Sequence, residues 1–244
     1  MAFRRAESAA QRVRYRAAPI RRKFVEASGG PAPLVRLMRG GRGGEVRLKL
    51  YLSALWIGVK SPHDIEFPAR AWAELLGLDE PSGNGTRRVT DAVRWLEQER
   101  MLLVKRDRGR PSKLIVLDDA GSGKPYEFPW ESKPQDVYAK LPAGFWTKQW
   151  ITKLSSAGVG LLLILLVRET YSGLGATSWV SPGRARDLYS LSSDTWSRAT
   201  KELRQLGLVD VSRIPVSLDD FSWRRVRNTY RLNHEALDDL RAPA

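Results

Sequence analysis

The stretch "RDLYSLSSDTWSRATKELRQLGLV", residues 186–209, decides the fold of this chain of 244 residues. Apolar side chains recur at helical spacing on both sides of a short polar turn, with Leu188 and Leu191 before it and Ala199 and Leu203 after it. The closing Gly-Leu-Val is typical of a helix that ends and runs into a strand. The stretch therefore predicts two helices joined by a tight turn and followed by a strand.

The sequence on either side extends this pattern. Upstream, "SSAGVGLLLILLVRETYSG" (155–173) predicts a buried apolar helix. Downstream, "WRRVRNTYRL" (223–232) predicts the returning strand of a hairpin, after the loop "IPVSLDDFS" (214–222). Three helices followed by a hairpin are therefore expected in this part of the chain.

The same order is predicted once before. Helical patterns occupy "EVRLKLYLSALWIGV" (45–59), "FPARAWAELLGL" (67–78) and "TRRVTDAVRWLEQER" (86–100). Two apolar runs around a basic turn follow in "MLLVKRDRGRPSKLIVL" (101–117), which is the outline of a second hairpin.

The two segments align residue by residue. Leu75 corresponds to Leu188 at an offset of 113, and Leu96 corresponds to Leu203 at an offset of 107. The earlier segment therefore carries a longer turn between its second and third helices. Self-similarity over a whole supersecondary unit predicts a duplicated architecture.

Residues 45–235 resemble two winged helix-turn-helix domains, of the kind found in MarR-type bacterial regulators and in the paired winged helices of plasmid replication initiators. The resemblance implies an α+β, mostly helical fold with two such domains in tandem, each with three helices and a β-hairpin wing. The expected boundaries are a basic flexible arm (1–44), a first domain (45–119), a linker (120–144) and a second domain (145–244). The aromatic "FWTKQWITKL" (145–154) is expected to pack against the second domain and to fix the angle between the two.

The resemblance also implies which residues contact DNA. In helix-turn-helix proteins the third helix enters the major groove, where its outward side chains reach base edges. The outward candidates on the two predicted third helices are Arg87, Arg88, Thr90, Asp91, Arg94, Asp194, Thr195, Ser197, Arg198 and Lys201.

Each predicted hairpin is strongly basic. The candidates for wing contacts are Lys105, Arg106, Arg108, Arg110, Lys113, Arg224, Arg225 and Arg227. "RGRP" (108–111) resembles the core of the AT-hook, in which a thin glycine backbone and two arginines fit a narrow minor groove. We therefore expect the first hairpin to meet something negative.

The composition points to the same class of partner. There are 41 basic and 27 acidic residues, so the formal net charge is +14, which points to a polyanionic partner, either nucleic acid or an anionic membrane surface. The absence of cysteine excludes disulfides, thiolate metal sites and cysteine nucleophiles. The longest uncharged apolar stretch (157–167) is too short to span a bilayer, and the N-terminus lacks a secretory signal, so a cytoplasmic, nucleoid-associated protein without membrane contact is expected.

No pattern in the sequence indicates an active site. His63 and His234 are far apart and have no ligand or nucleophile pattern beside them. "DDAGSGKP" (118–125) departs from a phosphate-binding loop, because Asp118 stands at the first glycine position and Pro125 at the Ser/Thr position. The acidic pairs, such as Asp118-Asp119, are better explained by turns and caps. We therefore expect no catalytic residues, no metal and no cofactor.

Three functions remain open at this stage. The first is a sequence-specific double-stranded DNA-binding protein, acting as a bacterial transcriptional regulator that reads an asymmetric site with two different third helices. The second is a plasmid or phage replication initiator or DNA-partition protein on the same scaffold. The third is a nucleic-acid-associated structural or interaction module in which one winged helix binds protein. The chain would act as a monomer with two reading heads or as a homodimer.

Overall fold

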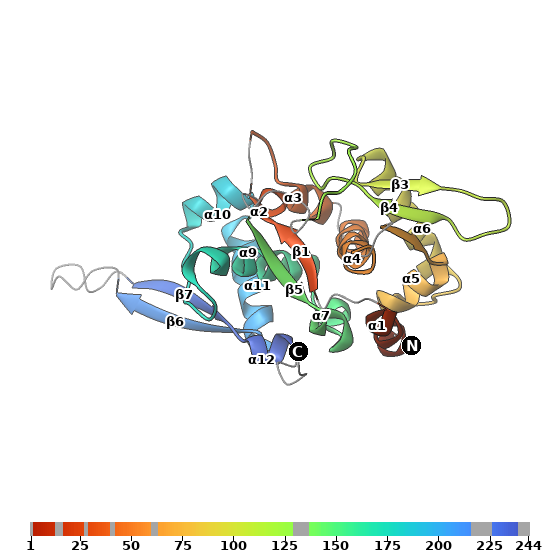
Figure 1. Ribbon diagram of the computed structural model, residues 1–244. Coiled ribbons are helices and arrows are strands. Elements are labelled where there is room, and N and C mark those ends of the chain that lie inside the picture. Colours follow the sequence, from red (N-terminus) through yellow and green to blue (C-terminus); the bar gives the residue numbers. More distant parts are fainter. Residues whose placement is uncertain are drawn as a thin grey trace.

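The computed structural model of the protein describes residues 2–12, 17–26, 29–39, 42–59, 63–128, 137–215 and 226–238 (Figure 1). The fold is α+β, with helices predominating and small antiparallel sheets. No helix of these ranges combines the length and apolar character that crossing a bilayer requires.

The first unit, residues 42–116, contains three helices and three strands. Its elements are α4 (Arg42–Ile57), β2 (Asp64–Glu66), α5 (Ala69–Leu75), α6 (Asn84–Gln98), β3 (Leu102–Lys105) and β4 (Lys113–Val116). The sheet order is β2-β4-β3, with both pairs antiparallel. Strand β2 was not predicted, because a three-residue strand shows no alternation long enough to recognise. The first helix begins at residue 42, slightly before the expected position 45.

The second unit, residues 156–232, repeats this order of elements. It contains α9 (Ser156–Ser172), α10 (Pro182–Tyr189), α11 (Ser193–Gln205), β6 (Val209–Pro215) and β7 (Val226–Leu232), followed by α12 (His234–Leu237). Strands β6 and β7 pair antiparallel, and Ser178 bridges to Tyr230 of β7 in the place that β2 takes in the first unit. Ser155, Ser181 and Ser192 cap α9, α10 and α11 by accepting a hydrogen bond from a backbone N–H of the first turn.

The expected flexible arm is wrong for the described part of residues 1–44. This part forms α1 (Ala2–Arg12), β1 (Ala17–Arg21), α2 (Arg22–Val25) and α3 (Pro33–Met38). Phe24, Val25, Leu34 and Leu37 are buried in the main core. The sequence did not indicate this contribution to the core. The segment is rich in basic residues, and its apolar residues are spread over short elements that show no long hydrophobic period.

The described part of the expected linker is also folded. Strand β5 (Tyr138–Pro142) pairs antiparallel with β1, and Figure 1 shows this two-stranded sheet between the two units. It continues into α7 (Gly144–Thr147) and α8 (Trp150–Lys153). Trp146 stacks on Trp56 of the first unit, while the Trp150 indole N–H donates to the Ala236 carbonyl beyond the second. The aromatic segment therefore packs against the first unit as well as against α12, which belongs to the expected second domain (145–244).

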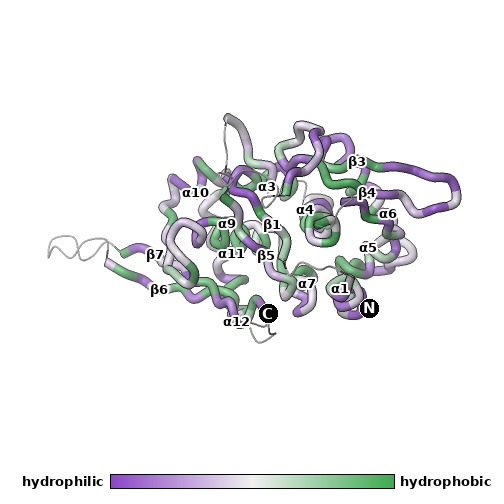
Figure 2. The backbone as a smooth tube through the Cα atoms, viewed as in Figure 1, coloured by the Kyte–Doolittle hydropathy of each residue, from purple (hydrophilic) through white to green (hydrophobic). Residues whose placement is uncertain are grey.

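One hydrophobic core runs through the molecule. The buried cluster joins α4 of the first unit to α9 of the second through β1, β5 and the N-terminal helices. Residues of low hydropathy are concentrated at the tip between β3 and β4 (Figure 2). The two units are thus held by shared packing and not by a tether.

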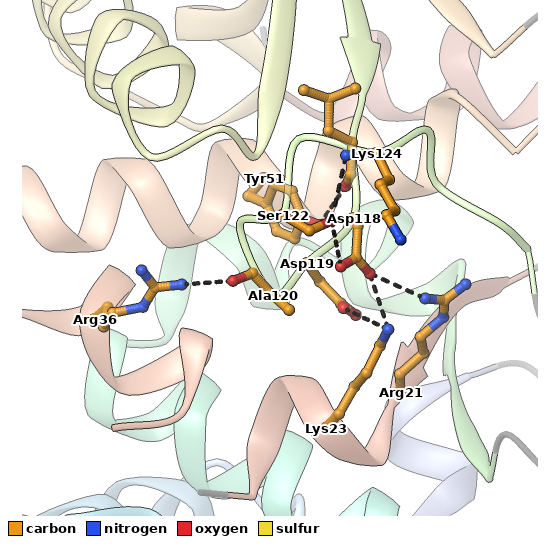
Figure 3. A network of polar contacts seen from close by, with 10 residues as sticks. Arg21, Lys23, Arg36, Tyr51, Asp118, Asp119, Ala120, Ser122 and Lys124 are labelled. Carbon is orange, nitrogen blue, oxygen red and sulfur yellow. Dashed lines mark hydrogen bonds and ion pairs between the residues drawn. The ribbon is translucent and has the colours of Figure 1, made fainter. Parts of the chain in front are cut away.

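A partly buried polar cluster ties the N-terminal segment to the turn after β4 (Figure 3). Asp118 accepts hydrogen bonds from Arg21 and Lys23, and Asp119, which is 1 % exposed, lies 3.7 Å from the Lys23 ammonium. Burial raises the pKa of Asp119 to about 7, although the charges of Arg21 and Lys23 oppose this. Burial also acts on Asp118, but hydrogen bonds from Lys23 and Ser122 lower the pKa of that carboxyl below its ordinary value.

This cluster predicts a pH-dependent stability. The folded state keeps a proton on Asp119 between about pH 4 and 7, where the unfolded chain has released it. The free energy of unfolding therefore falls as pH rises through this window, by an amount on the order of a few kcal/mol. Asp119→Asn should reduce the difference between urea midpoints measured at pH 5 and pH 8. An unchanged difference would exclude Asp119 as its source.

Candidate nucleic-acid interface

In the first unit, α6 and the β3–β4 hairpin border a groove of about 430 Å³. Phe67, Trp72, Val93 and Leu114 contribute to an apolar floor. Arg94, Arg106 and Arg110 bring positive charge to the lining, and no acidic side chain of the described residues lines it. The arginines at the border of such a groove can bind the charged groups of an anionic chain, while its apolar floor accepts the uncharged parts.

The predicted residues of α6 share one face but differ in what they bind. Arg87, Thr90, Asp91 and Arg94 are exposed and Arg88 is half-buried. Asp91 and Arg94 form an ion pair at 3.3 Å, and the Thr90 hydroxyl donates to the Thr86 carbonyl of its own helix. Arg87 and Arg88 have no side-chain partner in the described part of the chain, which leaves their guanidinium groups available.

The hairpin presents its charges at an open tip. Arg110 N–H donates to the Asp107 carbonyl, closing a turn in which Gly109 adopts φ +79°. Nothing lies within 4 Å of the position a Cβ would take at Gly109, so the tip is not buried against its own protein. Lys105, Arg108 and Arg110 are exposed and form no ion pair with described residues. Glycine supplies the positive φ that this turn requires.

Two predicted hairpin residues are engaged internally. The Arg106 guanidinium donates two hydrogen bonds to the Glu97 carboxylate, 3.0 and 2.6 Å long, and the Lys113 ammonium lies 3.2 Å from Asp64. The hydrogen bond from Arg106 lowers the pKa of Glu97 despite the opposing effect of burial. These two cations therefore contact an outside anion only in competition with an acid of the protein.

In the second unit, α11 and the β6–β7 hairpin border a groove of about 720 Å³. Its lining is more polar than that of the first groove, and includes Ser197, Thr200, Lys201, Arg204, Gln205, Arg213 and Asn228. Trp196 and Tyr230 lie at its base, where the indole N–H donates to the Tyr230 hydroxyl at 2.9 Å. No acidic side chain of the described ranges lines this groove either.

The predicted residues of the second unit fall into three groups. Ser197 and Lys201 are exposed and line the groove. Arg198 and Asp194 are exposed and pair with each other at 2.8 Å, while the Thr195 hydroxyl lies 2.9 Å from that of the helix cap Ser192. Thr195 therefore belongs to the helix cap as much as to the outward face.

The predicted residues of the second hairpin are described only in part. Arg227 stacks over the Trp179 ring, 4.7 Å from its centroid. Arg224 and Arg225 lie outside the described residues. Only Arg227 can therefore be assigned a position on this hairpin.

Comparisons with family models, with curated proteins and with solved structures found no match. The assignment of this surface therefore depends on its own geometry and charge. Within the described residues, no group of three histidine, aspartate or glutamate side chains is placed to hold a metal ion. His234 instead pairs with the buried Glu169 at 2.8 Å and fastens α12 to α9.

The two grooves contain equivalent residues. The offset of 107 matches Arg94 with Lys201, Val104 with Val211, and Arg106 with Arg213, and both members of each pair line their groove. Sequence reasoning missed Arg204 and Arg213 as candidates. The alignment of the two segments already showed that Arg204 takes the position of Glu97 and Arg213 that of Arg106. Only the structure shows that Arg204 and Arg213 line the groove beside the hairpin.

Proposed function

We propose that this protein binds double-stranded DNA through two winged helix-turn-helix units, with α6 and α11 as the recognition helices. The observation that carries the proposal is the recurrence of one arrangement: a cationic groove between the exposed face of a third helix and a basic hairpin, to which the described residues contribute no acidic side chain. In the winged-helix mode, the third helix reads the major groove while the wing meets the minor groove or the flanking phosphates.

The two units differ in their recognition helices. Arg87 of α6 corresponds to Asp194 of α11, and Thr90 corresponds to Ser197. Different side chains at equivalent positions favour different base pairs, so the preferred site is asymmetric. Figure 1 shows the hairpins projecting from opposite ends of the molecule, which suits wings that contact the two outer flanks of one site. We propose transcriptional regulation as the role of this binding.

A replication initiator or partition protein is the second candidate, because the same pair of units would serve it equally well. A footprint of the protein on DNA from its own genome or plasmid separates the two: a promoter favours regulation, and an origin or centromere favours the alternative. Failure to protect any duplex at low salt would reject both.

Substitutions separate phosphate contacts from base contacts. Replacing Arg108 and Arg110 together by Ala should weaken binding on all sequences, and should flatten the plot of log affinity against log salt by about 0.9 for each phosphate that is no longer neutralised.

Arg87→Ala and Arg198→Ala should instead relax base preference at one position each, by about 1–3 kcal/mol per bidentate pair removed. Affinities measured on a set of single-base variants distinguish the outcomes. Equal losses on every variant would refute base reading by Arg87 and Arg198.

A further inference from the structure

One hairpin arginine of the first unit, Arg106, is neutralised by the protein. Both hydrogen bonds of Arg106 to Glu97 join charged groups, and such bidentate pairs are among the stronger side-chain contacts. Glu97 lies on α6 and Arg106 just after β3, so the pair joins the helix to the hairpin beside the groove that Arg106 lines. A phosphate could bind there only by displacing the carboxylate.

In the second unit the position equivalent to Glu97 carries a positive charge instead of a negative one. Position 204 corresponds to position 97 and position 213 to position 106, so an Arg-Arg pair replaces the Glu-Arg pair. Arg204, Arg213 and Lys201 all line the larger groove. None of the three pairs with an acid among the residues that the structure describes. Like charges that converge on one groove repel each other unless an anion lies between them.

We infer that Lys201, Arg204 and Arg213 form a binding site for the phosphodiester backbone of a nucleic acid, and that Glu97 blocks the equivalent site in the first unit. The inference rests on the proposed function and adds a division of labour between the units. Thr200, Gln205 and Asn228 supply further hydrogen-bonding groups in the same groove. At these two positions the second unit can therefore neutralise phosphates that the first unit cannot.

A reciprocal charge swap tests this site. Arg204→Glu recreates the first unit's pair, because the new carboxylate can hold Arg213 as Glu97 holds Arg106. Because Arg204 is lost and Arg213 is paired within the protein, two phosphates lose their cationic partner. Affinity should fall about 10- to 100-fold for each, and the slope of log affinity against log salt should flatten by about 1.8. Glu97→Arg should do the opposite in the first unit, releasing Arg106 and steepening the slope.

Matched controls separate local effects from net charge. Lys140→Glu on β5 and Glu127→Arg change the net charge by the same amounts at exposed positions away from both grooves. Thermal unfolding of each variant shows whether it is folded. If Arg204→Glu and Lys140→Glu alter the slope equally, or if Arg204→Glu leaves it at the wild-type value, the site is refuted while DNA binding stands.

A readout without DNA separates a failure of this site from a failure of the proposed function. Titration with inorganic phosphate, followed by the ¹⁵N-arginine Nε–H signals, should shift Arg204 and Arg213 but not Arg106, and the Arg213 shift should disappear in Arg204→Glu. Phosphate binding at these residues without affinity for any duplex would support the site and reject the DNA-binding proposal. Equal shifts of Arg106 and Arg213 would overturn the proposed difference between the units.

Discussion

For the DNA binding proposed above, inserting either five or ten base pairs at the centre of the site should lower affinity by about 100-fold or more, to the level of a site with one half only. Five base pairs turn one half-site to the opposite side of the duplex, and ten restore its direction but move it by one helical turn of about 34 Å. A protein whose units share a core can follow neither change.

The comparison of the two insertions is the decisive measurement. A protein with units on a flexible tether loses affinity at five base pairs but recovers part of it at ten, because a tether can extend. The structure favours the rigid outcome, since β1 and β5 pair along their length and α4 contacts α9. A duplex with one half-site scrambled sets the floor for single-unit binding. Recovery at ten base pairs would show that the units separate in solution.

Much of each unit was predictable because its signals are local. The helical pattern of residues 86–100 predicted α6, in which Val89, Ala92 and Leu96 are spaced by three and four residues, and that of 186–209 predicted α11, in which Trp196, Ala199 and Leu203 have the same spacing. All six side chains are buried in the core, as that pattern requires. The hairpins followed from short apolar runs around turn residues, which need no information from elsewhere in the chain.

The element between the units was not predictable in this way. Strand β1 pairs with β5 although Ala18 and its partner Leu141 are separated by the whole of the first unit and its flanks. "AAPIR" (17–21) contains proline and shows no alternation, because four of its five residues are buried. Such a strand is defined by its tertiary contacts, and its many charged neighbours suggested an arm instead.

The residue types of the candidate site were predictable from the sequence, but it was not predictable which of its arginines form ion pairs within the protein. The sequence indicated which cations lie on the third helices and hairpins. It could not indicate that Glu97 holds Arg106 or that Arg204 and Arg213 line one groove, because these contacts join different elements. The distinction matters for function, since a paired arginine and a free one contribute differently to binding of an anion.

Replacing Trp146 by Ala should cost about 3–5 kcal/mol of unfolding free energy, the range for truncating a fully buried aromatic side chain. Trp146 is 0 % exposed and stacks on Trp56, with ring centroids 4.3 Å apart and planes inclined by 12°. Its indole N–H also donates to the buried Ser53 hydroxyl at 2.9 Å. The substitution leaves a cavity and removes the only donor that the structure's described residues offer to that oxygen.

Two further variants divide this loss into its parts and test the role of the segment between the units. Trp146→Phe keeps an aromatic ring against Trp56 but removes the donor to Ser53, so it should cost less, about 1–3 kcal/mol. Trp179→Ala removes a tryptophan that is 43 % exposed and stacked only on Arg227 among described rings and cations, and should cost about 1 kcal/mol. Urea denaturation measures all three. If Trp146→Ala were no more harmful than Trp179→Ala, residues 137–154 would be a dispensable linker. A loss in the expected range means that this segment belongs to the core shared by both units, which is the property on which the expected sensitivity to DNA-site spacing rests.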